Sequence, residues 1–102
     1  MEARMSTFAG PPERLDEFVQ GICRVAREAE QLDGYEGAYV LVGGSSGKVI
    51  TMTFWRSAEA ERASADEFKK IRTQVAAESG QRIQSIETYT VWLRLGAVSE
   101  LH

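Results

Sequence analysis

Hydrophobic residues recur every three or four positions in two long segments of the chain. In residues 13–31 the recurring positions are Leu15, Phe18, Val19, Ile22, Val25, Ala26 and Ala29. In residues 57–79 they are Phe68, Ile71 and Val75. Because this spacing gathers side chains on one side of a helix, the pattern predicts two amphipathic α-helices. The run Ala63-Ser64-Ala65 is a candidate break that would divide the second helix into a short part and a longer part.

Four other segments lack the helical spacing and are predicted to be strands. They cover residues 2–9, 35–42, 48–57 and 81–93. The two middle segments are rich in aromatic and β-branched residues, and the glycine-rich residues 43–47 join them as a hairpin loop. The order strand, helix, strand, strand, helix, strand predicts an α+β, ferredoxin-like βαββαβ fold. In this fold both helices cover one face of a four-stranded antiparallel sheet.

The third predicted strand lies within the segment KVITMTFWRS and is largely apolar on both faces. Alternation places Val49, Thr51, Thr53 and Trp55 on one face and Ile50, Met52 and Phe54 on the other. The two helices can cover only one face, and a large apolar face is rarely left exposed on a monomer. A second copy of the chain, packed sheet against sheet, would cover the other face. The pattern therefore predicts a homodimer.

Composition and charge narrow the class of protein and its partners. The length of 102 residues suits one domain, which we place at residues 1–93, followed by a C-terminal tail at 94–102. A net charge of −3 and a pI near 5.2 argue against nucleic acid and acidic membranes as partners. The start of the chain, MEARMSTFAGPP, has no secretory pattern, and no segment is apolar enough for a membrane span. These features predict a cytoplasmic protein.

Few residues of the chain could hold a metal or act as a catalytic thiol. The one histidine is His102 and the one cysteine is Cys23, so the chain has no histidine pair or cysteine cluster. A catalytic thiol also needs a base nearby. We therefore expect Cys23 to be a half-buried small residue of the first helix, and we expect no metal site.

Three short segments resemble a known family. The pattern GYEGAYVL, then KVITMTFWRS leading into a helix, then IETYTV near the end resembles the antibiotic biosynthesis monooxygenase superfamily of dimeric α/β barrels. The resemblance extends from the first strand to about Leu93. It implies a pocket between the helices and the sheet of each protomer. In the family's pattern the tryptophan of the Trp-x-Ser motif, here Trp55, lines that pocket, which would put Thr51 and Thr53 on the pocket side.

Two departures from the family bear on the chemistry. Haem-degrading members use a histidine on the long helix as the iron ligand, and aligning DEFKKIRTQV with that helix puts Arg72 at this position. They also use an asparagine in the first strand, whereas this chain contains no asparagine. Haem cleavage by that route is therefore not expected.

The resemblance then implies a cofactor-independent monooxygenase that oxidises a small aromatic molecule, such as a phenol, an anthrone or a quinol. Trp55 and Arg72 are its candidate catalytic residues, with Arg72 holding the deprotonated substrate by charge and hydrogen bonds. The candidate pocket-lining residues are Thr51, Thr53, Phe68, Tyr39 and Tyr89. A structural interpretation remains open beside each role.

In the structural interpretation Trp55 fills space, Arg72 extends to solvent, and the tyrosines, Tyr35 included, pack within strands. Two alternatives for the whole protein also remain open. One is a small-ligand-binding protein without turnover, and the other is a structural or stress-associated dimer with a filled core.

Overall fold

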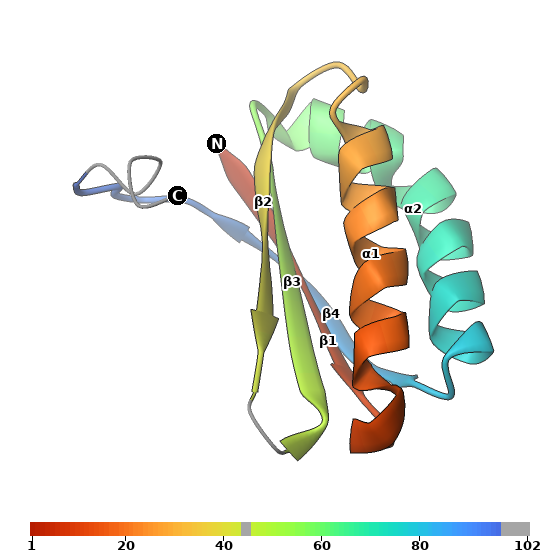
Figure 1. Ribbon diagram of the computed structural model, residues 1–102. Coiled ribbons are helices and arrows are strands. Elements are labelled where there is room, and N and C mark those ends of the chain that lie inside the picture. The colour runs from red at the N-terminus through yellow and green to blue at the C-terminus, as the bar shows by residue number, and fades with distance from the viewer. Residues whose placement is uncertain (44–45, 97–102) are drawn as a thin grey trace.

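The computed structural model describes residues 1–43 and 46–96. Its elements are β1 (Glu2–Ala9), a 3-10 turn (Pro12–Arg14), α1 (Leu15–Ala29), β2 (Tyr35–Val42), β3 (Lys48–Trp55), α2 (Ala58–Glu78) and β4 (Arg82–Thr90). The strands form one antiparallel sheet in the order β2-β3-β1-β4. Both helices lie side by side over the same face of this sheet, and no helix of the described residues covers the other face (Figure 1). The predicted ferredoxin-like α+β fold is confirmed.

Local sequence signals set the ends of the helices. Pro12 opens a 3-10 turn, so α1 begins at Leu15, two residues later than predicted. The side chain of Ser57 accepts a hydrogen bond of 3.1 Å from the backbone N–H of Ala60 and thereby caps α2. Gly34 follows α1 at φ 82°, a conformation that residues with a Cβ rarely adopt. Within the described residues no helix is long and apolar enough to cross a membrane.

The predicted break in α2 is wrong, because the helix is continuous from Ala58 to Glu78. The Ser64 hydroxyl donates to the backbone carbonyl of Glu61 at 2.8 Å, so it bonds within its own turn of the helix. Alanines at positions 63 and 65 favour the helix. The serine therefore lies inside the helix without ending it.

The two ends of β4 differ slightly from the prediction. The strand starts at Arg82 and ends at Thr90, three residues before the predicted end. Beyond it Trp92, Leu93 and Leu95 are among the most exposed large hydrophobic residues of the described chain, with Trp92 94% exposed. Residues 97–102 of the predicted tail and residues 44–45 of the predicted hairpin loop lie outside the described residues.

The register of the sheet decides which side chains face the helices. Thr53 of β3 pairs with Arg4 of β1, and Thr51 pairs with Ser6. Val49 and Trp55, the outer members of the same alternating row, are completely buried. The buried residues form two clusters under the helices. One comprises Phe8, Phe18, Ile22, Val49 and Ala76, and the other Ala29, Trp55 and Phe68.

The alternate residues of β3 lie on the helix-free face. Ile50, Met52 and Phe54 are only partly buried, and Met52 pairs with Met5 of β1. Leu41, which pairs with Ile50 on the neighbouring strand, is exposed. The predicted alternation of β3 is therefore observed, and no helix or strand among residues 1–43 and 46–96 covers the other apolar face of the sheet.

Candidate functional site

The inward face of α2 is unusually polar. Its buried residues are Glu61, Ser64, Phe68, Arg72 and Ala76, which recur at spacings of three and four. The predicted stripe shared only Phe68 with this row, because Ile71 and Val75 are half-buried. Arg72 belongs to the buried row and is 8% exposed. The interpretation in which Arg72 extends to solvent is therefore wrong.

A second buried arginine comes from the central strand β1. Arg4 is 4% exposed, and its Nε donates to Oε1 of Glu61 at 2.9 Å. One Nη of the same side chain donates to the backbone carbonyl of Glu61 at 2.6 Å and to the Ser64 hydroxyl at 2.9 Å. Thr88 of β4 adds a bond of 3.3 Å to the same carboxylate oxygen of Glu61. The Arg4 guanidinium is thus held by a carboxylate, a carbonyl and a hydroxyl.

Arg4, Glu61 and Ser64 were not predicted from the sequence as residues of the site. Charged residues are usually exposed, so the sequence alone predicts that Arg4 and Glu61 lie on the surface. A signal was nevertheless present in β1, because alternation puts Arg4 and Ser6 on the same face as Phe8, which is completely buried. A strand whose core-facing row reads Arg-Ser-Phe carries a polar site inside the protein.

Arg72 has weaker internal partners than Arg4. Its Nη1 donates to the Ser6 hydroxyl at 3.5 Å, the limit of a hydrogen bond, and its buried Nε has no partner among the described residues. Burial, followed by the positive charge of Arg4, lowers the pKa of Arg72 to about 10. The guanidinium therefore remains charged at neutral pH. In the part of the chain that the structure describes, Arg4, Arg72 and Glu61 are the buried charged groups of this site, and together they carry one net positive charge.

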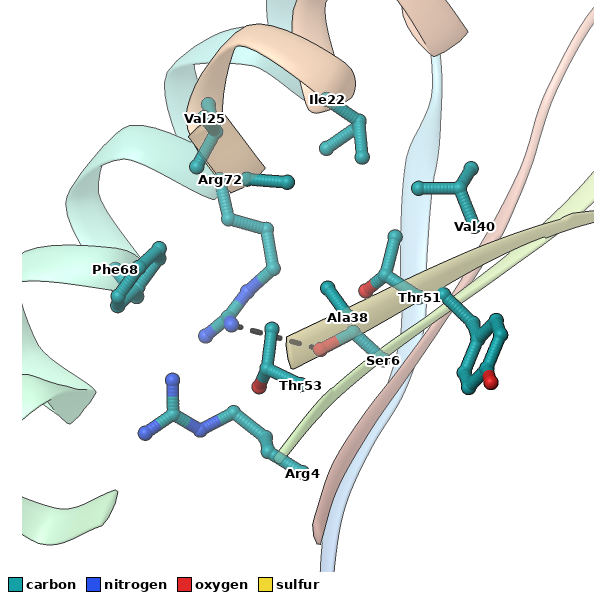
Figure 2. A pocket seen from close by; sticks show the side chains of 12 residues that line it. Arg4, Ser6, Ile22, Val25, Ala38, Val40, Thr51, Thr53, Phe68 and Arg72 are labelled. Atoms are coloured by element: carbon teal, nitrogen blue, oxygen red, sulfur yellow. Dashed lines mark hydrogen bonds between the residues drawn. The ribbon is translucent and has the colours of Figure 1, made fainter. Parts of the chain in front are cut away.

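Arg4 and Arg72 border a cavity of about 40 Å³ between the helices and the sheet. Figure 2 shows Arg4 extending from the sheet and Arg72 from α2 toward the same space, with Ser6, Thr51 and Thr53 along the sheet side. The remaining lining residues are mostly apolar: Ile22, Val25, Ala26, Ala38, Tyr39, Val40 and Phe68. A water molecule needs about 10–15 Å³ of such space, so the cavity has room for about three waters or one small polar group.

Trp55 lies behind this site and is not among the residues that line it. Its indole Nε1 donates to the Thr53 hydroxyl at 3.0 Å, and its ring packs edge-on against Tyr35 and Phe68 at 5.6 and 5.8 Å. The guanidinium carbon of Arg4 lies 5.4 Å from the centre of the Trp55 ring, a cation–π distance. In this structure Trp55 fills space and supports Arg4 and Phe68.

The three tyrosines differ in their relation to the cavity. Tyr39 borders it, but the register pairs Tyr39 with Met52, and its ring packs edge-on against Phe54 at 6.0 Å on the helix-free face. Tyr35 packs on Trp55. Tyr89 is exposed, and its hydroxyl donates to Oε2 of Glu87 at 2.6 Å. Of the predicted site residues, the structure therefore gathers the side chains of Thr51, Thr53, Phe68 and Arg72 around the cavity.

The polar groups of the cavity do not fit haem iron. The resemblance aligns Arg72 with the family's iron-ligating histidine, and a protonated guanidinium offers no lone pair to a metal. In residues 1–43 and 46–96 no three His, Cys, Asp or Glu side chains lie close enough together to hold a metal ion. The site instead offers N–H and O–H donors around a positive charge, which suits an oxyanion.

Comparisons with known proteins find similarity in fold, whereas the sequence comparisons find no match. No family model matches the sequence, and no curated protein matches it. Among solved structures, a protein from Deinococcus radiodurans assigned to the antibiotic biosynthesis monooxygenases matches with a TM-score of 0.78 and 15% identity. That match covers 95% of this chain and 98% of the other.

Two other matches carry names that state an activity. SnoaB, a cofactor-independent oxygenase from Streptomyces nogalater, matches with a TM-score of 0.73 and 16% identity over 94% of this chain and 97% of its own. MhuD, a heme-degrader from Mycobacterium tuberculosis, matches with a TM-score of 0.67 and 21% identity over 94% and 100%. At these low identities the likeness concerns the fold. This chain has the fold of the antibiotic biosynthesis monooxygenase structures, as its sequence motifs predict.

Proposed function

We propose that this protein is a cofactor-independent monooxygenase whose substrate is an electron-rich aromatic molecule, such as a phenol, an anthrone or a quinol, that reacts with O₂ as its anion. Arg72 carries the proposal. Its charged guanidinium is buried beside a cavity, and among the described residues its Nε has no partner and its one hydrogen bond is to Ser6. The likeness in fold to SnoaB supports the same class of reaction.

The proposed role of the site is to favour the anionic form of the substrate. Placing the substrate oxygen at Arg72 stabilises negative charge on it and lowers the pKa of the bound substrate. The released proton passes to solvent. The low polarity of the surrounding wall, with Phe68 and Val25, strengthens this charge interaction.

The overall reaction with an anthrone is balanced without a cofactor. The substrate anion gives electrons to O₂, and a carbon–oxygen bond forms at the ring carbon that carried the methylene hydrogens. The O–O bond then breaks, one oxygen atom stays on the substrate as a ketone, and the other leaves with the two hydrogens as water. The substrate supplies all the electrons, so O₂ is the only co-reactant.

The helix-free sheet face supports the proposal that the active form is a homodimer. Ile50, Met52 and Phe54 form a partly exposed apolar row on that face. A second copy packed sheet against sheet would remove this row from water and complete an α/β barrel. We also retain a cytoplasmic location, with which the single free Cys23 agrees.

Oxygen consumption tests the proposed activity. An oxygen electrode should record uptake with an anthrone or a hydroquinone, and Arg72→Met should abolish the enzymatic part of that uptake. Arg62→Met is the matched control, because Arg62 lies on the exposed side of the same helix. Absence of uptake across a broad panel of phenols, anthrones and quinols would refute the monooxygenase function.

A second candidate function is binding of the same aromatic anions without turnover. The cavity beside Arg72 favours it, since the cavity provides a binding site but has no carboxylate or histidine base among its lining side chains. Anions that raise the melting temperature while no oxygen is consumed would favour this alternative. The same cavity argues against a structural dimer with a filled core.

A further inference from the structure

A second depression on the surface lies next to the cavity. It is an open groove of about 300 Å³ between α1 and the edge strand β2. Its walls come from α1 between residues 23 and 27, from Glu30 just after the helix, and from residues 35–40 of β2. The register of β2 shifts between Tyr35 and Gly37, and a Cβ built on Gly37 would meet no atom within 4 Å. The irregular start of β2 therefore leaves open space along this groove.

The groove and the inner cavity share part of their walls. Ala26 of α1, Ala38 of β2 and Val40 of β2 line both of them. In Figure 2, Ala38 and Val40 lie on the opposite side of the cavity from Phe68. Two of the three shared side chains are single methyl groups, so the wall between the groove and the inner cavity beside Arg72 is thin.

The inner cavity alone is too small for an aromatic substrate. Its volume of about 40 Å³ accepts one polar group, whereas the groove provides several times this volume. The two charged residues that line the groove, Arg27 and Glu30, are of opposite sign. The charge that selects a ligand therefore comes from the inner site, which both Arg4 and Arg72 line and where only Arg4 is paired with a carboxylate among the described residues.

We propose that the groove binds the aromatic body of an elongated monoanion whose charged oxygen lies at Arg72, and that this ligand enters between α1 and β2. The inference rests on the anion site of the proposed function and adds the shape, charge and entry path of its ligand. It does not depend on turnover. A single net positive charge in the inner site favours a monoanion over a neutral molecule of the same shape.

Cys23 provides a direct test, because its half-buried thiol lines the groove and is the only thiol of the chain. The experiment measures the rate at which N-ethylmaleimide alkylates Cys23, with 2-naphthoate or its neutral analogue 2-naphthamide present. At nine times its dissociation constant, 2-naphthoate should slow alkylation about tenfold, because about one tenth of the protein then remains free. The amide at the same concentration should leave the rate unchanged.

Two variants locate the effect. Ala26→Phe places a ring in the shared wall and should remove both the protection of Cys23 and the stabilisation by 2-naphthoate. Ala63→Phe adds the same ring to an exposed position of α2 and should leave both intact. Retained protection in Ala26→Phe would show that the ligand does not pass the shared wall.

Three results with the unmodified protein would overturn the inference. They are stabilisation by 2-naphthoate without protection of Cys23, equal protection by the amide, and no stabilisation by 2-naphthoate at all. The oxygen-uptake test fails independently of this one. Protection of Cys23 without oxygen consumption would refute the monooxygenase function and support ligand binding in the groove. Oxygen consumption without protection would support the monooxygenase function and refute ligand binding in the groove.

Discussion

Arg4 on β1 and Arg72 on α2 bring two buried guanidinium groups to one cavity, and of these two only Arg4 has a carboxylate partner among residues 1–43 and 46–96. Burying a charge is unfavourable unless it is paired and hydrogen-bonded. Glu61 offsets that cost for Arg4. For Arg72 a ligand anion would offset it, and this difference leads to opposite predictions for the two arginines.

Replacing Arg72 by Met should stabilise the ligand-free protein. The variant removes an unpaired buried charge and keeps a flexible side chain of similar length. Urea unfolding should show an increase of about 1–3 kcal/mol in the free energy of unfolding. A decrease would mean that Arg72 is a structural residue.

Replacing Arg4 by Met should strongly destabilise the protein. The variant leaves the buried carboxylate of Glu61 without its cation, which typically costs about 3–5 kcal/mol. The double variant Arg4→Met/Glu61→Gln should recover part of this loss, because it also removes the carboxylate charge that lost its cation. A double-mutant cycle by urea unfolding measures the coupling. Additive losses in the two single variants would contradict the buried ion pair.

Trp55 should contribute mainly to stability. Trp55→Phe removes the hydrogen bond to Thr53 and part of the packing on Tyr35 and Phe68, at an expected cost of about 1–3 kcal/mol. Binding of 2-naphthoate should persist in this variant, since Trp55 does not line the cavity. Trp92→Phe is the matched control, and its effect should stay within about 0.5 kcal/mol because Trp92 is exposed. Complete loss of binding in Trp55→Phe would assign the indole a direct role.

The pKa of Tyr35 should be measurably high. Burial raises it above the usual value of 10, and the negative charge of Glu30 raises it further. The folded protein then keeps the proton more tightly than the unfolded chain. Stability should therefore fall as pH rises from 10 through the pKa of the folded state.

Absorbance at the tyrosinate wavelength, compared between the wild type and Tyr35→Phe, isolates this titration. Glu30→Gln should lower the pKa of Tyr35 without returning it to 10, because burial is the larger cause. A Tyr35 titration at or below 10 would contradict its position against Trp55.

The helix-free sheet face should make the protein a dimer at micromolar concentration in sedimentation experiments. Met52→Glu places a charge in the centre of the apolar row and should shift the population to monomers. Lys70→Glu changes an exposed residue on the outer side of α2 and should leave the dimer intact. A wild-type protein that remains monomeric at tens of micromolar would exclude the proposed α/β barrel.

Much of the fold follows from local patterns. The helix stripe of α1, the proline-rich entry to it, the alternation in β3 and the glycine after each helix all depend on neighbours close in the chain. For this reason the predicted strands and helices lie within a few residues of the observed ones. The failures arose where a polar residue is compatible with burial only because of a distant partner, as with Ser64 and Arg72 in α2.

The order of hydrophobic and polar residues was sufficient for the βαββαβ order and for a β3 strand that is apolar on both faces, because periodicity and turn residues act locally. It could not reveal that Arg4 and Glu61, 57 positions apart, form a buried pair. Nor could it show that Arg72 lines the same cavity as Arg4, whereas Trp55 does not line it. Those relations depend on strand register and on the packing of α2 over the sheet. Only the tertiary structure therefore distinguished the arginine that is paired with a carboxylate from the one that has no carboxylate partner among the described residues.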